Sequence, residues 1–530
     1  MSASTTAAGA PAVKVAAVRV VSGVAVAALV AGVAVLGARL PSPATDEVTV
    51  PGALVDVPFS PTRLVCAAPL VLPQERDADD AFDPVPVAPL TSLVAAVTSS
   101  GGGTVTDLAG GVVVERLGAG ATATTRRWVT DALVVQAEPT DDPATVAAAT
   151  SSYVTAGDLR GLAAASCQAP TTDAWLVGGS TELGATALLV LQNAGSTAAV
   201  VHLDVYGATG PVDLATEQYL VAPGAERVVV LGGLAPEERR VAVHVTASGG
   251  RVTAHVQDST LDGFTPTGTD LVVASAAPSR RQVVPGVVLL ATDVDDPDAG
   301  VLRLLAPGTA ATTARVRLLG PDGVEDLPGA GELRLDPGVV TDVPLGGLPA
   351  GAYTLVVEAD RAVVASAMLA RPGDPTAQDP DVPTRERAWV PSVAPADAAA
   401  ATDTQVVAVP DRATGTLVLG AVATSGALDG DGTATAQVRV LGADGEPVAR
   451  ERVELELGRT AAWDLTDLVP AGTRVRGVQV VPDDGAWLAG ALVAQADRPD
   501  GTLLSVLVPV PGDLVAGATE VREDPRLGTR

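Results

Sequence analysis

Three histidines are the residues of this chain most able to bind a transition metal, and all three fall within residues 202–255. His202, His244 and His255 each occupy the polar side of a strand-like alternation, and three imidazoles are a known ligand set for Zn²⁺. No Asp or Glu is placed by spacing to complete a site. Later copies of the same segment have Arg315 and Gln437 where His202 stands. We therefore predict no metal site and expect these histidines to be solvated strand residues.

Two acidic turns are candidates for Ca²⁺, because this hard cation prefers oxygen ligands and is bound by many extracellular modules. In the turn at 293–298, however, Pro297 occupies the fifth position. The turn at 429–432, Asp-Gly-Asp-Gly, has no glutamate at the distance that an EF-hand requires. Polar turns are the simpler interpretation, and weak calcium binding stays an open alternative.

The chain lacks the usual signatures of nucleophilic catalysis. It has no Gly-x-Ser-x-Gly elbow, and Lys14 is its only lysine, which removes Schiff-base, P-loop and Ser-x-x-Lys chemistry from everything that follows. A carboxylate pair for glycoside hydrolysis has no fixed spacing, so the 62 acidic residues leave that chemistry open. Aromatic residues, which commonly form sugar platforms, make up only 2%. We predict no enzyme activity, no catalytic residue and no cofactor.

The two cysteines, Cys66 and Cys167, each open a similar tetrapeptide, Cys-Ala-Ala-Pro and Cys-Gln-Ala-Pro. If this part of the chain is exported, both lie in a compartment where disulfides persist, and we predict that they pair. Two free buried thiols, or two ligands of a metal, are the alternatives. A zinc site would need four ligands at close spacing, and the sequence offers none nearby.

An uncharged run at 20–38 determines whether the rest of the chain is exported. As a helix of about 1.5 Å per residue it spans roughly 28 Å, close to the hydrocarbon core of a bilayer. Lys14 and Arg19 precede it, so the positive-inside rule predicts residues 1–19 in the cytoplasm and everything after about residue 40 outside. A cleaved signal peptide is the alternative, and both interpretations export the same domains.

The charge balance excludes one class of partner. The chain carries 62 acidic and 34 basic residues, for a formal net charge of −28. Nucleic acids bind basic surfaces, so we predict that they are not partners. At 47% hydrophobic residues the chain can still build sizeable cores.

Three landmarks recur in the same order in the later part of the chain. The segments 200–210, 314–323 and 436–445 are strand-like and end in glycine, and each is followed by a Gly-Gly-Leu or Asp-Leu-Val turn and a pair of strand-like segments. Alternation with a period of two predicts strands that are buried on one face. Repeats with about seven short strands predict an all-β protein of tandem antiparallel, immunoglobulin-like β-sandwiches.

These patterns divide the chain into seven parts. We expect a cytoplasmic N-terminus at 1–19, a transmembrane signal-anchor at 20–38, an irregular N-terminal β region at 39–157, β-sandwich repeats at 158–280, 281–385 and 386–512, and a disordered tail at 513–530. The predicted disulfide would tie the irregular region to the first repeat.

One stretch resembles a known family. Its residues are Gly-Asp-Leu-Arg-Gly-Leu-Ala-Ala-Ala-Ser-Cys at 157–167, Ala169-Pro170, Trp175 and Gly178-Gly179. Together with the early Cys-x-x-Pro motif and the strand 189–193 that leads into 201–210, this stretch resembles an actinobacterial family of exported proteins, Domain of Unknown Function 5719, over about residues 60–510. The resemblance implies a place in the cell envelope and assigns no catalytic residue, substrate or cofactor.

The expected function is that of a membrane-anchored, non-enzymatic β-sandwich scaffold or stalk in the bacterial cell envelope. Its partners would be the membrane, through the N-terminal helix, and an envelope protein or glycan. The expected location is the cell membrane with the bulk of the chain outside, or secretion after signal cleavage. The alternative function is a module that binds or hydrolyses envelope glycan on a β-sandwich spacer, which a deep pocket with paired carboxylates or the three histidines would favour.

Overall fold

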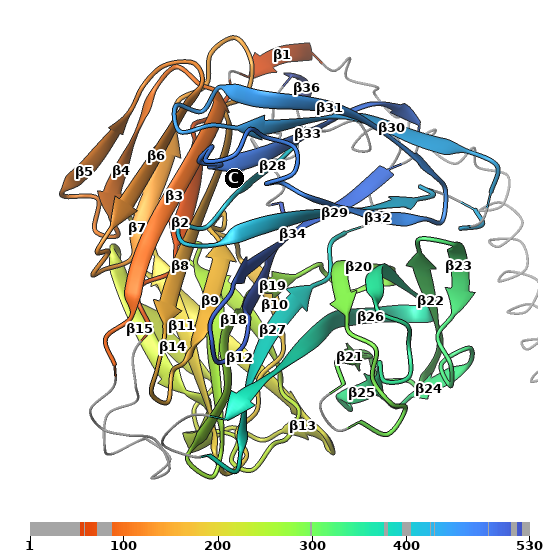
Figure 1. Cartoon of the computed structure of the whole chain (residues 1–530). Helices are drawn as coiled ribbons and strands as arrows, with labels where there is room; N and C mark the ends of the chain where they lie inside the picture. Colours follow the sequence, from red (N-terminus) through yellow and green to blue (C-terminus); the bar gives the residue numbers. More distant parts are fainter. Residues whose placement is uncertain are drawn as a thin grey trace, which may run out of the picture. The chain divides into compact units, whose positions relative to one another are not determined.

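The computed structural model describes residues 53–57, 59–70, 87–296, 299–375, 380–394, 404–424, 426–428, 430–485, 487–509 and 517–521 (Figure 1). Apart from a 3-10 turn, η1 (Leu231–Gly233), the regular elements of these residues are strands, and the strands pair in antiparallel fashion. The predicted all-β class is thus confirmed. Within these ranges no helix has both the length and the apolar character to cross a bilayer. The predicted anchor at 20–38 lies outside the described residues.

The chain divides into two compact units, one made of residues 1–57 and 517–530 and the other of residues 58–516. In the first unit, β1 (Ala53–Val57) pairs with β36 (Gly517–Val521). This strand corrects the prediction of disorder across 513–530, of which only 517–521 is described. The partner strand lies more than four hundred residues earlier in the chain, so no local pattern near residue 517 indicates the pairing.

The second unit contains four modules of successive strands. Module 1 consists of β2 (Thr62–Cys66), β3 (Leu90–Ser99), β4 (Gly103–Asp107), β5 (Val113–Leu117), β6 (Thr122–Arg127), β7 (Leu133–Ala137), β8 (Thr145–Val154) and β9 (Gly161–Ser166). Module 2 consists of β10 (Asp173–Val177), β11 (Ala185–Asn193), β12 (Ala199–Gly207), β13 (Gly210–Val212), β14 (Gln218–Val221), β15 (Ala225–Val230), β16 (Ala242–Ser248), β17 (Thr253–Asp262), β18 (Thr265–Val272) and β19 (Ala274–Ser275). Module 3 consists of β20 (Ser279–Leu289), β21 (Val301–Leu305), β22 (Thr312–Gly320), β23 (Gly323–Asp326), β24 (Leu333–Leu335), β25 (Thr341–Pro344), β26 (Gly351–Pro375) and β27 (Pro383–Pro391). Module 4 consists of β28 (Gln405–Ala408), β29 (Thr414–Val422), β30 (Thr433–Leu441), β31 (Pro447–Glu456), β32 (Thr460–Asp464), β33 (Gly477–Gly485), β34 (Trp487–Ala496) and β35 (Leu503–Leu507).

The four modules share one topology. Module 1 has sheets of order β2-β7-β4-β5 and β6-β3-β8-β9, and module 4 repeats both orders as β28-β33-β30-β31 and β32-β29-β34-β35. Module 2 has the matching order β15-β11-β17-β18. In module 3 the single long strand β26 takes two places, because its first part pairs with β20 and β22 and its second part with β21 and β27.

The region at 39–157, predicted to be irregular, therefore holds most of a fourth copy of the sandwich. The predicted boundary at 157/158 also cuts this copy, because β9 pairs with β8 and completes module 1. Residues 71–86, which are not described, fall between the first and second strands and separate them widely in sequence. In addition, β8 reads Thr-Val-Ala-Ala-Ala-Thr-Ser-Ser-Tyr-Val and lacks the alternation that reveals a half-buried strand.

Each module encloses an apolar core between its two sheets. In module 2, Val201, Leu203 and Val205 of β12 are buried, whereas the intervening residues of the strand are partly exposed. This alternation agrees with the period of two in the sequence. In module 1 the core contains Leu93 and Val135 from opposite sheets. The sheets are therefore packed face to face.

The modules also pack against one another and form a closed ring. Their last long strands, β9, β18, β27 and β35, contact one another in turn, and Figure 1 shows β9, β18 and β27 side by side near the middle of this unit. The seams are apolar, because residues of two modules share one buried cluster at each: Ala165 and Leu271 (modules 1 and 2), Val177 and Leu305 (2 and 3), Val287 and Val506 (3 and 4), and Ala96 and Val438 (4 and 1). The approach is close at Gly286, where an added Cβ would lie 2.5 Å from that of Ala491. Both faces of several sheets are thus covered.

Candidate functional site

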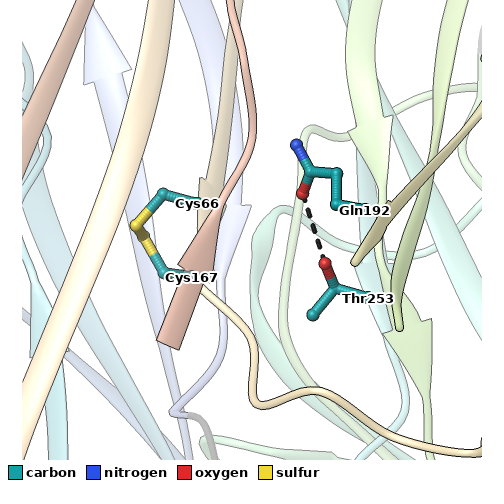
Figure 2. Close-up of a disulfide and its surroundings, with 4 residues drawn as sticks. All are labelled: Cys66, Cys167, Gln192 and Thr253. Carbon is teal, nitrogen blue, oxygen red and sulfur yellow. Dashed lines mark hydrogen bonds between the residues drawn. A yellow bond between two sulfur atoms is a disulfide. The ribbon is translucent and has the colours of Figure 1, made fainter. Parts of the chain in front are cut away.

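A disulfide joins Cys66, the last residue of β2, to Cys167, which follows β9 (Figure 2). The two residues are 101 positions apart in the sequence. The main chain around the disulfide is also paired, since Val65 N donates to Gln168 O at 2.8 Å and Gln168 N donates to Val65 O at 2.9 Å. Both cysteines lie at the ends of module 1. The bond therefore closes module 1 and does not tie an irregular region to the next repeat, as the sequence suggested.

Beside the disulfide, module 2 presents a polar group of side chains from β11 and β17. Thr253 Oγ1 donates to Gln192 Oε1 at 3.2 Å, as Figure 2 shows, and Gln192 Nε2 donates to Glu226 Oε2 at 2.9 Å. Gln192, Thr253 and His255 line a small hollow together with residues of module 1. Burial lowers the pKa of His255 to about 4, so its ring is neutral at physiological pH. The expectation that His255 is solvated is wrong, because module 1 covers this face of β17.

The other two histidines lie on β12 and β16, in the other sheet of module 2. The His244 ring stacks on Trp175 with centroids 4.0 Å apart, and its two nitrogens lie 3.2 Å from Asp204 Oδ2 and 3.0 Å from Asp173 Oδ2. His202 Nε2 is 3.4 Å from Asp204 Oδ1. The three histidines are thus not gathered into one site. Across the described ranges, no group of three or more His, Cys, Asp or Glu residues is arranged to hold a metal ion.

The two acidic turns considered for calcium are only partly described, because residues 297–298 and 429 lie outside the described ranges. Weak calcium binding there stays an open alternative to the polar turns that the sequence favours.

A cluster of buried polar groups lies where β9, β18, β27 and β35 meet, and all four modules contribute to it. We call it the central cluster and define it as Arg160 of module 1, Asp270 of module 2, Glu386 and Trp389 of module 3, and Asp500 and Ser505 of module 4.

Arg160 connects three of these modules. Its side chain is 2% exposed, and it donates from Nε to Asp500 Oδ2 at 2.7 Å and from Nη2 to the main-chain oxygen of Asp500 at 3.0 Å. Its Nη1 lies 3.7 Å from Glu386 Oε2. Glu386 Oε1 accepts a hydrogen bond from the main-chain nitrogen of Leu162 at 3.1 Å. The last strands of modules 1, 3 and 4 are therefore linked through polar contacts at the ring centre.

Asp270 links the remaining module. Its Oδ2 accepts from the main-chain nitrogen of Trp389 at 2.7 Å, and its Oδ1 lies 2.9 Å from Ser505 Oγ. Ser505 Oγ also lies 2.9 Å from the main-chain oxygen of Ala164. A serine hydroxyl carries one proton, so it can donate to only one of these oxygens. If Ser505 donates to Ala164, it can accept a hydrogen bond from a protonated Asp270.

The carboxyl groups of the cluster differ in pKa. Burial raises the pKa of Asp270 to about 8, against opposing hydrogen bonds from Trp389, Leu271 and Ser505. Burial likewise raises the pKa of Glu386 well above its usual value. For Asp500, burial opposes ionisation, but the hydrogen bond and charge of Arg160 outweigh it and lower the pKa. Asp500 is thus the carboxylate that pairs with Arg160, whereas burial favours the protonated forms of Asp270 and Glu386.

Carboxyl groups with raised pKa values are typical of catalytic sites. Asp270 and Glu386, however, are placed differently. Asp270 and Glu386 are each 1% exposed, and both are hydrogen-bonded to strands of neighbouring modules. Their arrangement suits the joining of modules rather than contact with a substrate. The sequence did not indicate them, because each occupies an ordinary strand pattern, and only the packing of the modules shows that both faces of that strand are covered.

Replacing Arg160 by methionine is expected to lower the free energy of unfolding by about 3 kcal/mol, because Asp500 loses its buried partner. This value is at the low end of the usual cost of breaking a buried ion pair, because Asp500 is 24% exposed and water can partly rehydrate it. Urea unfolding of the full chain measures the change. Arg334→Met, which removes an exposed pair with Asp336, serves as the control and is expected to change stability by less than about 0.5 kcal/mol. A loss below about 1 kcal/mol for Arg160→Met would contradict the role given to this pair.

A second group of charged residues lies at the surface between modules 1 and 4. Arg127 of β6 binds Asp411 through two hydrogen bonds, Nε to Oδ2 at 2.7 Å and Nη2 to Oδ1 at 3.1 Å. Arg476 Nη1 lies 3.6 Å from the same carboxylate. The hydrogen bond from Arg127, with further positive charge from Arg476 and Arg412, holds the pKa of Asp411 below its usual value. The carboxylate is therefore ionised and shared.

The residues that follow this pair line a shallow hollow. It is formed by Leu90, Thr91, Ser92, Arg127, Trp128 and Arg412. The Trp128 side chain is 68% exposed. The only feature of the sequence that marks Trp128 is its position directly after two arginines.

A comparison with protein-family models found a match. The model of a family of unknown function (DUF5719) matches residues 119–466, more than half of the chain and a shorter span than the resemblance suggested. No curated protein and no solved structure matches the chain.

Proposed function

The chain belongs to this family of unknown function, DUF5719, and from that premise we propose that it is a non-enzymatic scaffold of the bacterial cell envelope. The family description assigns no activity, so the proposal depends on how the four modules are joined.

The rigid joining of the modules supports the proposal, and it is the observation that carries it. At every seam an arginine donates a hydrogen bond from one module to the next: Arg63 Nη1 to Ala194 O at 3.3 Å, Arg303 Nη1 to Gly179 O at 2.7 Å, Arg281 Nη1 to Ala423 O at 3.1 Å, and Arg127 Nε to Asp411 Oδ2 at 2.7 Å. With the apolar seams and the central cluster, these bonds make it costly to move one module alone.

The contact between modules 1 and 4 favours a scaffold over a stalk. A stalk of tandem domains places its first and last members far apart, whereas here Ala96 of module 1 and Val438 of module 4 share one buried cluster. Such a ring presents surfaces in a fixed relation, which suits the holding of partners together. The modules are close to immunoglobulin-like domains in size. We therefore also propose that each module is an immunoglobulin-like β-sandwich.

The proposed place is the outer side of the cell membrane. The uncharged run at 20–38 with Lys14 and Arg19 before it supports an anchor that leaves the modules outside. A disulfide within module 1 supports an oxidising compartment. Envelope proteins or glycans would then be the partners.

The test uses a photo-crosslinking residue placed in the full chain in living cells. At Glu454, an exposed position of the edge strand β31, we expect crosslinks to a defined envelope component. The matched control is Leu455, the adjacent buried position, where no crosslink is expected. Protease added to intact cells is expected to reach the modules. Turnover of envelope glycan or peptide by the purified chain, or protection of the modules from external protease, would refute the proposal.

A further inference from the structure

Two residues at the seam between modules 1 and 4 have left-handed backbone conformations. Trp128 has φ of 61° and Arg412 has φ of 66°, and both line the same shallow hollow. Each directly follows one member of the Arg127–Asp411 ion pair. A bulky residue in this conformation costs on the order of 1–2 kcal/mol, and such strain collects at functional sites. Two strained residues at one spot therefore call for an explanation beyond folding.

The side chains displayed there do not contribute to a core. Trp128 is 68% exposed, and Arg412 is also exposed. In the part of the chain that the structure describes, Arg412 forms no ion pair, because Asp411 is bound by Arg127 and Arg476. In a chain of net charge −28, this spot thus carries an excess of positive charge.

We propose that Trp128, Arg127 and Arg412 form a binding site for an acidic sugar unit, that is, a pyranose ring that carries a carboxylate or phosphate. The exposed indole would stack on the apolar face of the ring, and the guanidinium of Arg412 would bind the anionic group in the planar geometry that arginine favours. Arg127 adds positive charge while it stays paired with Asp411. The proposal goes beyond the scaffold function, because it assigns a ligand class to a particular surface.

The dimensions of the site favour a sugar over a protein partner. The hollow is formed by only six residues, among which Trp128 offers the one large exposed apolar surface. A stable protein interface needs on the order of 1,000 Å² of buried area, which this spot alone does not offer. The strong overall negative charge also repels an extended acidic protein beyond the local site. One charged ring can lie on the exposed Trp128 side chain and matches the local positive charge.

The test titrates the full chain with trigalacturonate and with its methyl ester, which keeps the rings and loses the charges. Trigalacturonate is expected to bind at least about tenfold more tightly than the ester, and more weakly as salt is raised. Trp128→Gly and Arg412→Asn are each expected to weaken binding by about tenfold or more. Both replacements suit a left-handed backbone, so the melting temperature should stay the same or rise. Loss of binding would then not reflect unfolding.

Matched controls change the same chemistry elsewhere. Phe264→Gly removes a side chain that is 85% exposed, and Arg334→Asn removes an exposed arginine; neither should affect the affinity. Glucose 6-phosphate tests whether the anionic group can be a phosphate. Its binding, with the same losses of affinity in the two site variants, would also support the site. Equal binding of the acid and its ester, unchanged affinity in both site variants, or pentaglutamate binding as tightly as trigalacturonate would overturn the proposal.

Discussion

Replacing Asp270 by asparagine is expected to raise the stability of the protein at pH 8 by several kcal/mol and to leave it nearly unchanged below pH 4. Burial raises the pKa of Asp270 from 3.8 to about 8 in the folded protein. A raised folded-state pKa contributes stability that is complete below the unfolded pKa and is lost as pH rises through the folded one. The window is therefore about pH 4 to 8. At about 1.4 kcal/mol per pKa unit, the upper limit is about 5 kcal/mol.

Asparagine suits the position because it resembles the protonated carboxyl. Its oxygen can accept from the main-chain nitrogen of Trp389, as Asp270 Oδ2 does, and its amide can donate to Ser505 Oγ. Ser505 can then donate to Ala164 O. The variant keeps the contacts of the neutral form and removes the charge that alkaline pH would place inside the ring.

The measurement is urea unfolding of both proteins at pH 4, 6 and 8. Comparing the two curves removes the contribution of other titrating groups, and Asp336→Asn, an exposed aspartate, should give a curve parallel to the wild type. If the difference between wild type and Asp270→Asn does not grow with pH, the carboxyl is not buried and protonated as described.

Removing the disulfide is expected to cost about 4–5 kcal/mol in the Cys66→Ala, Cys167→Ala double variant. The bond closes a loop of 101 residues, and the chain-entropy estimate rises with loop length. The loss falls within module 1, so unfolding of the variant should begin there. Hydrogen exchange followed strand by strand measures this, with strong loss of protection expected in β2 and β9 and little in β22 of module 3.

The control is the wild-type protein with the bond reduced, which should lose about the same stability as the double variant. A double variant within about 1 kcal/mol of the wild type would mean that contacts from neighbouring modules already hold both ends of module 1 in place.

The sequence predicted features of the fold that depend on one sheet face meeting water. The alternation in 201–206 indicated a half-buried strand, and β12 is such a strand. The prediction from alternation failed where a neighbouring module covers the second face of a sheet. For this reason β8 shows a run of alanine and serine without alternation, and His255 is buried although its position in the pattern is polar. Alternation reports which face meets water, and it does not show which faces meet another module.

The candidate sites could likewise be predicted from the sequence only where they do not depend on contacts between modules. Cys66 and Cys167 were found because a chain with only two cysteines leaves few choices. Arg160, Asp270 and Glu386 were not found, because they meet only when four strands from four modules come together. Trp128 and Arg412 are close only across a seam, and their left-handed backbone has no counterpart in the sequence.

The closure of the ring by modules 1 and 4 sets an order for biogenesis. Module 1 is synthesised first, and the surface of β3 that carries Val94 and Ala96 is covered by module 4, which is synthesised last. Until module 4 is made, this apolar surface is exposed on the nascent chain. We therefore expect the newly synthesised polypeptide to need a chaperone, and a gene truncated before residue 404 to yield protein that aggregates or is degraded.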